Sequence, residues 1–261
     1  MNKHKDKETG RVAIVTGATG GLGSAMALAF AEEGTKVVVN YNRSKDKAES
    51  ISNQINENIP NMAFPFKADV GNYPEVLAMV DKTLETWGRI DILVNNAGCW
   101  PPKESGFATG YKREGVLIVD MGHDEWEWYL ASQLTGPFNC IKAVADPMIK
   151  QGGGHIINIG GGIGLRGRTG NSGYAAAKGG LLGVSRTAAL ELGQYNIKVN
   201  MAIPGPVNHP SVSWVFREGE VGGGLLGRNQ TPEEFARFVV NMTHYENISG
   251  QMFFAENRIM I

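Results

Sequence analysis

Residues 11–23 read RVAIVTGATGGLG, an apolar run followed at once by a turn with four glycines. The continuous run VAIV is typical of a strand buried on both faces, because alternation with polar residues is expected only where one face meets water. The glycines let the chain turn sharply, and the pattern after them predicts a helix over 24–33. A strand, a glycine turn and a helix in this order predict the first unit of a parallel α/β sheet.

The rest of the chain keeps the same alternation. Strand patterns follow at 36–41, 63–67, 90–94, 155–159, 197–202 and 251–255, and helical patterns lie between them over 44–58, 73–87, 123–150, 172–192 and 232–242. This order predicts a seven-stranded parallel sheet with helices on both faces, in a single domain over 1–261.

Three stretches interrupt the alternation. Residues 99–122 hold two prolines, four glycines and only a short strand pattern at 116–119. Residues 160–170 read as a glycine-rich loop, and 204–230 as a long loop expected to contact substrate. Within 123–150 a glycine precedes a proline at 136–137, which predicts a bend in that helix.

The composition argues against several functional classes. The formal net charge of −1 offers no attraction to nucleic acid or to an anionic membrane surface. No apolar run is long enough to span a bilayer, and the polar start MNKHKDKETG is unlike a secretory signal. The two cysteines suit a reducing compartment, and the five histidines show no metal-ligand spacing. We therefore expect a cytoplasmic protein without metal, nucleic-acid or membrane partners.

Tyr174 and Lys178 are four residues apart in a predicted helix, so their side chains lie one turn apart on one face. An ammonium beside a phenol favours the phenolate and lowers the pKa of the phenol. Such a tyrosine can exchange a proton with a substrate oxygen near neutral pH. Taken alone, the same spacing also fits an ordinary exposed helix face, so the surrounding fold decides between the two interpretations.

Further motifs lie where predicted strands end. Gly17, Gly21 and Gly23 allow backbone amides to approach a pyrophosphate at a helix amino terminus. Asp69–Val70 and the NNAG segment at 95–98 follow strands at their carboxyl ends, where ligands bind in such sheets.

Together these motifs resemble the short-chain dehydrogenase/reductase family. TGATGGLG at 16–23, Asp69–Val70, NNAG at 95–98, Tyr174-x-x-x-Lys178 and PGPV at 204–207 cover nearly the whole chain in order. The resemblance implies a Rossmann-type doubly wound fold, a nicotinamide cofactor, and hydride transfer between a secondary alcohol and a ketone. It implies that Tyr174 is the general acid/base and that Lys178 holds the nicotinamide ribose.

The resemblance also implies which residues contact the cofactor: Gly17, Thr19, Gly21, Leu22, Gly23, Tyr41, Asn42, Arg43, Asp69, Val70, Asn95, Ala97, Gly98, Tyr174, Lys178, Pro204, Gly205 and Val207. NAD-preferring members usually carry an acid at the end of the second strand, where this chain has Tyr41. Asn42, Arg43 and Ser44 could hold a 2′-phosphate, whereas Gly20 stands where many NADP-preferring relatives carry a basic residue. The balance favours NADP slightly, and NAD stays open.

The chain departs from the family pattern at two catalytic positions. Gly161 stands thirteen residues before Tyr174, where the family has a serine that bonds the substrate oxygen. Loss of one such donor costs on the order of 10²–10³ in rate. Gln133 stands where the family has an active-site asparagine. Asn171, Ser172, Gln133 or a residue of the insertion could supply the missing bond.

Two further departures concern regions outside the catalytic pair. Gly98 to Gln133 is 35 positions, whereas the family needs about twenty, within the usual range for a helix and short loops. The excess over 99–122 carries Trp100, Phe107, Tyr111, Lys103, Lys112 and Arg113. It is expected to be a substrate lid or subunit contact, or else a solvated loop. The ending Ala255–Arg258 also replaces the family's Asp-Gly-Gly.

Two functions are compatible with these residues. The first is an NAD(P)-dependent enzyme acting on a secondary alcohol or ketone, with a 3-hydroxyacyl thioester as one candidate substrate. The second is a cofactor-binding but catalytically weak subunit, paired with an active relative, or a dinucleotide sensor. The resemblance further suggests a homodimer or homotetramer packed through the helix of Tyr174, where Ala175–Ala177, Gly179 and Gly180 would permit close approach.

Overall fold

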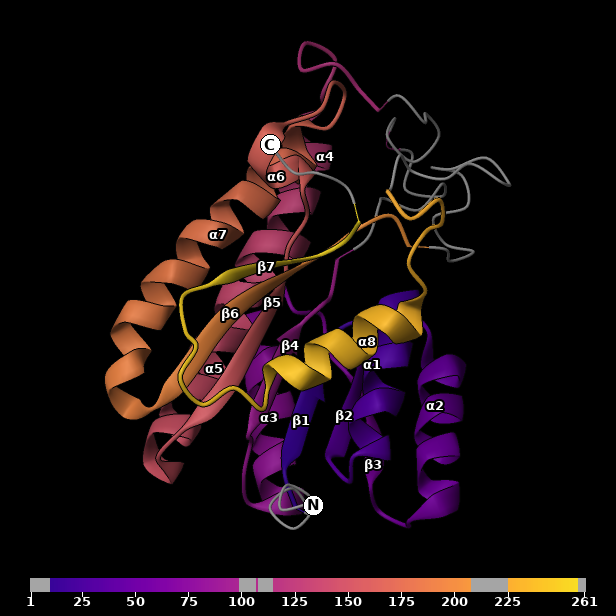
Figure 1. Cartoon of the computed structure of the whole chain (residues 1–261), viewed down its shortest axis with the longest axis vertical. Helices are drawn as coiled ribbons and strands as arrows, with labels where there is room; N and C mark the ends of the chain where they lie inside the picture. The colour runs from indigo at the N-terminus through magenta and orange to yellow at the C-terminus, as the bar shows by residue number, and fades with distance from the viewer. Residues whose placement is uncertain (1–9, 99–106, 108–114, 208–224, 258–261) are drawn as a thin grey trace.

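The computed structural model describes residues 10–98, 107, 115–207 and 225–257. Seven strands form one parallel sheet in the order β3-β2-β1-β4-β5-β6-β7 (Figure 1). The strands are β1 (Val12–Val15), β2 (Lys36–Tyr41), β3 (Ala63–Lys67), β4 (Ile92–Asn95), β5 (Gly154–Ile159), β6 (Ile197–Pro204) and β7 (Met252–Ala255). The predicted Rossmann-type doubly wound sheet is confirmed, while the extent of a single domain over 1–261 stays a prediction.

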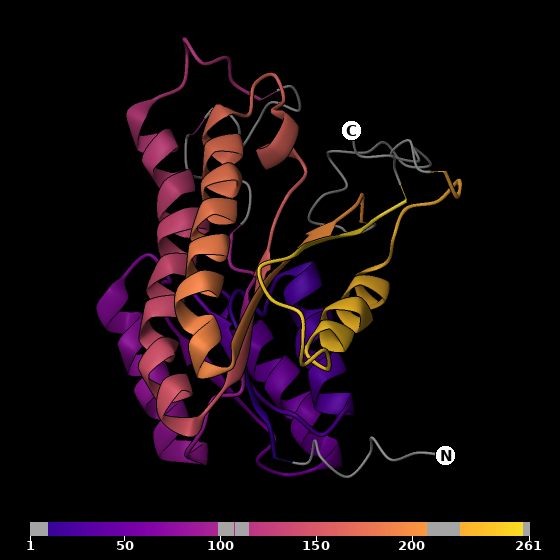
Figure 2. The same ribbon diagram turned by 60° about the vertical axis from the view of Figure 1, so that its left-hand side comes forward.

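Helices cover both faces of the sheet (Figures 1 and 2). α1 (Gly21–Glu32), α2 (Lys45–Asn58) and α8 (Pro232–Met242) share one apolar core with the sheet. α3 (Tyr73–Trp87), α5 (Gly136–Gln151) and α7 (Ser172–Leu192) share the other. Alternate strand residues point into opposite cores: Val37 and Val39 into the first, and Val38 into the second. This two-sided burial explains the unbroken apolar runs in the sequence.

Several predicted elements are observed with the same bounds or within one residue of them. β2, β3, α3 and α7 match their predicted ranges. α8 begins with the predicted cap: the Thr231 hydroxyl accepts from the Glu234 N–H at 3.2 Å, and the Glu234 carboxylate accepts from the Thr231 N–H at 2.9 Å. This reciprocal pair satisfies two amides that the helix cannot bond internally.

Two local predictions were wrong, and a third was refined. Residues 116–119 form no strand; Val116 makes a single bridge to Asn171, while Leu117, Ile118 and Val119 are exposed. The stretch over 123–150 is helical throughout, and a π-helical segment, Ala131–Thr135, lies between α4 (His123–Leu130) and α5, directly before Gly136. The loop over 160–170 contains a short helix, α6 (Ile163–Arg166), which ends at Gly167 with a φ of 69°.

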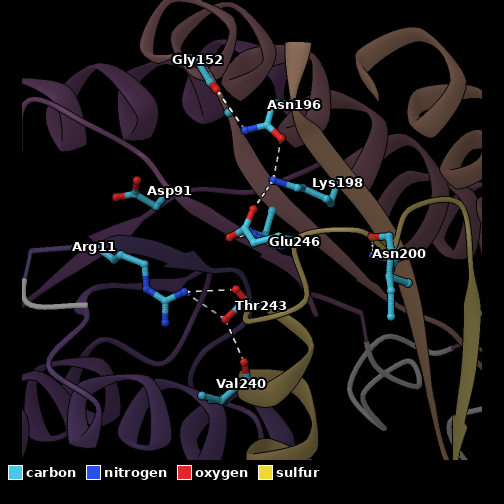
Figure 3. A network of polar contacts seen from close by, with 12 residues as sticks. Arg11, Asp91, Gly152, Asn196, Lys198, Asn200, Val240, Thr243 and Glu246 are labelled. Atoms are coloured by element: carbon cyan, nitrogen blue, oxygen red, sulfur yellow. Dashed lines mark hydrogen bonds and ion pairs between the residues drawn. The ribbon is translucent and has the colours of Figure 1, made fainter. Parts of the chain in front are cut away.

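At the amino end of the sheet, a polar network connects the starts of β1 and β6 with the segment that follows α8 (Figure 3). The Lys198 ammonium donates to the Glu246 carboxylate at 2.5 Å and to the Asn196 Oδ1 atom at 2.8 Å. Arg11 donates to the Thr243 carbonyl at 3.2 Å, which ties the end of α8 to the start of β1. The connection from α8 to β7 is therefore held at the end of the sheet opposite the expected ligand site.

In the described part of the chain, no helix has both the length and the apolar character that crossing a membrane requires. Within the same residues, no cluster of three or more histidine, cysteine, aspartate or glutamate side chains could hold a metal ion.

Candidate active site

The loops after β1 and β4 are tied together at the carboxyl end of the sheet. The Thr16 hydroxyl accepts from the backbone amides of Asn96 and Ala97 at 2.9 and 3.0 Å and donates to the Val94 carbonyl at 3.1 Å. The Asn96 side-chain amide donates to the Thr16 and Gly17 carbonyls at 2.9 and 3.1 Å. Thr16 and Asn96 thus set the shape of the glycine turn, although neither was among the predicted site residues.

The glycine turn leaves no room for side chains at two of its predicted positions. A Cβ atom on Gly17 would lie 2.8 Å from the Ala97 Cα, and one on Gly23 would lie 2.3 Å from the Gly17 carbonyl oxygen. α1 has no acidic residue in its first turn and no side-chain cap, so its first amides are open to an anion. A cradle of this kind fits the pyrophosphate of a dinucleotide. Gly21 opens α1, and Thr19 and Leu22 beside it are partly buried.

The end of β2 is held by a residue that the motif analysis missed. The Asn40 Oδ1 atom accepts from the Gly17 amide at 3.0 Å, and its Nδ2 atom donates to the Ala68 carbonyl at 3.1 Å. The Tyr41 side chain, by contrast, is buried in the core shared with α1 and α2. Asn42 and Arg43 are therefore the exposed side chains that the end of this strand presents to a ligand.

Asp69 and Val70 occupy fixed positions after β3. The Asp69 carboxylate accepts from the Asn42 side-chain amide at 3.0 Å and from the Gly71 amide at 2.9 Å. The Asn139 side chain of α5 donates to the Val70 carbonyl at 3.0 Å. These bonds hold both residues at the edge where the family pattern expects adenine.

Asn95 belongs to a buried chain of hydrogen bonds. Its Nδ2 atom donates to the Asn158 Oδ1 atom at 2.8 Å, and Asn158 donates in turn to the Ser185 hydroxyl at 2.8 Å. The chain connects β4, β5 and α7, so the strand that ends at the predicted cofactor site is braced to the helix of Tyr174 and Lys178.

Tyr174 and Lys178 meet at the carboxyl end of β5. The Lys178 ammonium donates to the Ile159 carbonyl at 2.8 Å and lies 5.9 Å from the centroid of the Tyr174 ring. The Tyr174 ring packs edge-on against the Tyr129 ring, with 6.3 Å between centroids. The predicted pair is thus brought together and enclosed rather than spread over an exposed helix face.

The protonation of this pair differs from the expectation drawn from spacing alone. Burial raises the pKa of the Tyr174 phenol to about 12, whereas the proximity of Lys178 predicted a lowered pKa. Burial lowers the pKa of the Lys178 ammonium to about 8. Removal from water disfavours the charged form of each group, and at Tyr174 this effect outweighs the lysine. Near pH 7 the phenol therefore carries its proton and most Lys178 side chains are cationic.

The described candidates for replacing the missing serine lie in two places: Gln133 in the π-helical segment, and Asn171 and Ser172 at the start of α7. Gln133 is buried in the π-helical segment and packs against Gly98, where an added Cβ would lie 2.6 Å from the Gln133 Cγ. The Asn171 side chain donates to the Thr169 carbonyl at 2.9 Å. Ser172 lines a shallow cavity of about 300 Å³ with Val116 and Arg168, and Tyr174 is not part of that lining.

The segment after β6 completes the set of predicted positions. Gly205 packs against Glu256, whose Cβ would lie 2.5 Å from a Cβ on that glycine. Val207 forms a bridge with Gln230, and Pro204 ends β6. Most of the predicted insertion and of the substrate loop, namely 99–106, 108–114 and 208–224, lies outside the described residues, and so does the end of the chain from Arg258.

Comparison with known proteins places this arrangement in a family. The short chain dehydrogenase model matches residues 11–219. A 3-oxoacyl-(acyl-carrier-protein) reductase of Synechocystis is 37% identical over 248 residues, which cover 94% of this chain and 95% of the relative. The protein of the same name from Thermotoga maritima is 32% identical over 97% of this chain and 98% of the relative. One from Staphylococcus epidermidis is 38% identical over 74% of this chain and 73% of the relative. The chain therefore belongs to the short-chain dehydrogenase family and is an oxidoreductase.

Proposed function

We propose that this chain reduces a ketone to a secondary alcohol with NADP as cofactor, and that its substrate is a 3-oxoacyl thioester. The Tyr174–Lys178 pair at the end of β5, with Lys178 buried and Tyr174 partly buried, is the observation that carries the proposal. The substrate class is supported by the names of the relatives, which are 3-oxoacyl-(acyl-carrier-protein) reductases.

The protonation of the pair suits reduction. When bound, the reduced nicotinamide supplies a hydride to the carbonyl carbon. Tyr174 donates its phenolic proton to the carbonyl oxygen, and it is protonated for this role because burial raises its pKa to about 12. Lys178, with a pKa near 8, is mostly cationic at pH 7 and stabilises the phenolate left behind. Its bond to the Ile159 carbonyl keeps the ammonium at the end of β5.

The choice of NADP rests on Arg43. Its guanidinium is exposed just after the end of β2, and it makes no ion pair with any residue in the described ranges. The neighbouring acid, Asp69, already accepts from Asn42. A free guanidinium favours a 2′-phosphate over a bare ribose, because two parallel bonds to phosphate are strong.

Titration of both cofactors tests this choice. Arg43→Gln should weaken NADPH binding roughly 10-fold or more and leave NADH binding within about 2-fold, as expected for one lost charge-assisted bond. Lys45→Gln is the matched control, because Lys45 is also exposed and pairs with Glu49. Equal weakening of both dinucleotides, or none, would refute the role of Arg43.

An assay of the isolated chain tests the reaction. NADPH oxidation should be followed with the acetoacetyl thioester of coenzyme A, with longer 3-oxoacyl thioesters, and with simple ketones. We expect turnover on the thioesters. Bound cofactor without turnover on any of these compounds would refute the proposal.

One observation favours the second candidate, a catalytically weak subunit or sensor. Gly161 provides no hydroxyl for the substrate oxygen, and Gln133 replaces the family's asparagine. This candidate predicts that the isolated chain binds dinucleotide, and that activity appears only when an active relative is added.

Assembly and location remain part of the proposal. A homodimer or homotetramer in the cytoplasm is the expected state. Packing of a second copy through the helix of Tyr174 stays a prediction. Within the chain, Gly179 and Gly180 also pack against Gly164 and Leu134. Light scattering of the purified chain measures the number of copies.

A further inference from the structure

The backbone at the carboxyl end of β5 lies directly against the catalytic pair. A Cβ on Gly164 would lie 2.7 Å from the backbone of Lys178 and Gly179. A Cβ on Gly160 would lie 2.7 Å from the Met201 sulfur on the neighbouring strand. The run of glycines after Ile159 therefore lets α6 and the strand end approach α7 more closely than side chains would allow.

Gly161 is the glycine that faces the reacting group. A Cβ atom built on it would lie 2.6 Å from the Tyr174 hydroxyl oxygen and 3.3 Å from two carbons of the ring. Real Cβ atoms do not approach an oxygen so closely, because the overlap is strongly repulsive. The phenol thus occupies the volume that any side chain at position 161 would need.

Tyr129 limits the movement of the Tyr174 ring on one side. It packs edge-on against that ring and is itself almost fully buried. Tyr129 is in turn held close to α7, since a Cβ on Gly173 would lie 2.7 Å from its ring. A side chain at position 161 would therefore displace the hydroxyl, the one atom whose place matters for proton donation.

We propose that Gly161 is a positioning residue: the absence of a side chain at the end of β5 sets where the Tyr174 hydroxyl lies. This inference rests on the proposed function in so far as it concerns turnover. It implies that a serine at this position adds no useful donor to this chain. The serine displaces the phenol instead, and a misplacement of about 1 Å can cost on the order of 10²-fold in rate.

Kinetics provide the first test. Gly161→Ser and Gly161→Ala should each lower kcat by roughly 10- to 10²-fold, with KM and NADPH affinity changed by less than about 3-fold. Gly183→Ala is the matched control, because it adds the same methyl group to α7 where no atom lies within 4 Å. A rise in kcat on Gly161→Ser would overturn the proposal.

A stability cycle tests the same contact without any assay of activity. Gly161→Ala should lower Tm by about 2–10 °C, as expected when a packed site is overfilled. In a chain that already carries Tyr174→Phe, which removes the hydroxyl, the loss of Tm caused by Gly161→Ala should be less than half as large. Should Gly161→Ala alone fail to fold, recovery of folding by Tyr174→Phe is the expected result.

The two tests separate the two proposals. Equal loss of Tm with and without the Tyr174 hydroxyl, or no recovery of folding, would overturn the positioning role even in an active reductase. The wild-type chain could lack turnover while the loss of Tm from Gly161→Ala still depends on the Tyr174 hydroxyl. That result would support the contact between Gly161 and Tyr174 and refute the proposed function.

Discussion

Lys178 and Lys198 are both almost fully buried, and they lie at opposite ends of the same sheet. Lys198 is the second residue of β6 and donates to the Glu246 carboxylate and the Asn196 side chain. Lys178 lies beside the carboxyl end of β5 and, among the described residues, donates a hydrogen bond only to a backbone carbonyl. The buried cation at the amino end is thus paired with a carboxylate, whereas the one at the carboxyl end is bonded to a backbone carbonyl.

The difference separates a structural cation from a chemical one. Burying an ammonium is costly unless a partner compensates it. At the amino end the connection between α8 and β7 supplies that partner. At the carboxyl end no described carboxylate compensates Lys178, and its lowered pKa reports the cost. An incompletely compensated charge is available to a ligand, which is what a reaction site needs.

The largest expected effect is at the carboxyl end. Tyr174→Phe should lower kcat by about 10²–10⁴-fold, because it removes the proton donor and little else. Binding of NADPH, measured by calorimetric titration, should change by less than about 3-fold. Tyr195→Phe, at an exposed tyrosine after α7, is the control. Retained turnover would assign the proton transfer to another group.

Replacing each lysine by methionine tests most directly whether the two buried cations differ in their effects on stability and turnover. Lys198→Met should lower the free energy of unfolding by about 1–3 kcal/mol and leave kcat nearly unchanged, because it removes two hydrogen bonds far from the site. Lys178→Met should abolish most turnover and weaken cofactor binding. Lys178→Met should also leave the free energy of unfolding unchanged or raise it by on the order of 1 kcal/mol, because the substitution removes an incompletely compensated charge.

Chemical unfolding and kinetics of both lysine variants provide these values. If Lys178→Met destabilised the fold as much as Lys198→Met, the distinction between the two cations would be wrong.

The amino end should also respond to acid. Burial, the charge of Lys198 and, less strongly, the charge of Arg11 lower the pKa of His155 from 6.5 to about 4, and Glu246 opposes this shift. The unfolded chain therefore binds one more proton than the folded chain between pH 6.5 and pH 4. Stability should fall as the pH is lowered through this window, by at most about 1.4 kcal/mol per pH unit from this group.

Unfolding measured at several pH values tests this dependence. His155→Leu should flatten the decline between pH 6.5 and 4, whereas His123→Gln, at an exposed position on α4, should not. An unchanged slope in His155→Leu would show that other groups take up the acid protons.

The smallest expected effect concerns α8, which leads into the amino-end network. Thr231→Ala removes the hydroxyl that caps this helix and should cost about 1 kcal/mol of stability. Turnover should stay within about 2-fold. Thr86→Ala is the control, because within the described ranges the Thr86 hydroxyl donates only to the Lys82 carbonyl, one turn earlier on the exposed face of α3. A loss confined to turnover would mean that the cap serves the site rather than the helix.

Sequence patterns predicted what depends on local spacing. The run VVV predicted β2 correctly, and the helical period of apolar residues predicted α3 correctly. Burial on one or both faces of an element produces a regular pattern of apolar residues in the sequence. The pairing of Tyr174 with Lys178 followed from the same periodicity. Residues 116–119 carried a strand-like signal, but Leu117, Ile118 and Val119 are exposed, and the buried Val116 makes only a single bridge.

Other features depend on contacts between distant segments, which local patterns do not reveal. Thr16 and Asn96 lie within quoted motifs and Asn40 within none, but all three shape the predicted cofactor cradle through hydrogen bonds to residues that lie 23 to 81 positions away. The raised pKa of Tyr174 follows from its burial, which spacing alone does not reveal. The crowding at Gly161 likewise needs the position of the Tyr174 hydroxyl.

The all-parallel order of the sheet has a consequence for how the chain folds. No two neighbouring strands are joined by a hairpin, and the central pair aligns Ala13 with Ile92. Such pairing requires a long loop to close before any contact is gained, so we expect slow folding for a protein of this size. During synthesis β1 must wait for β4 to emerge from the ribosome. β7, by contrast, pairs only with β6 at the edge, so it adds to a sheet that has already formed.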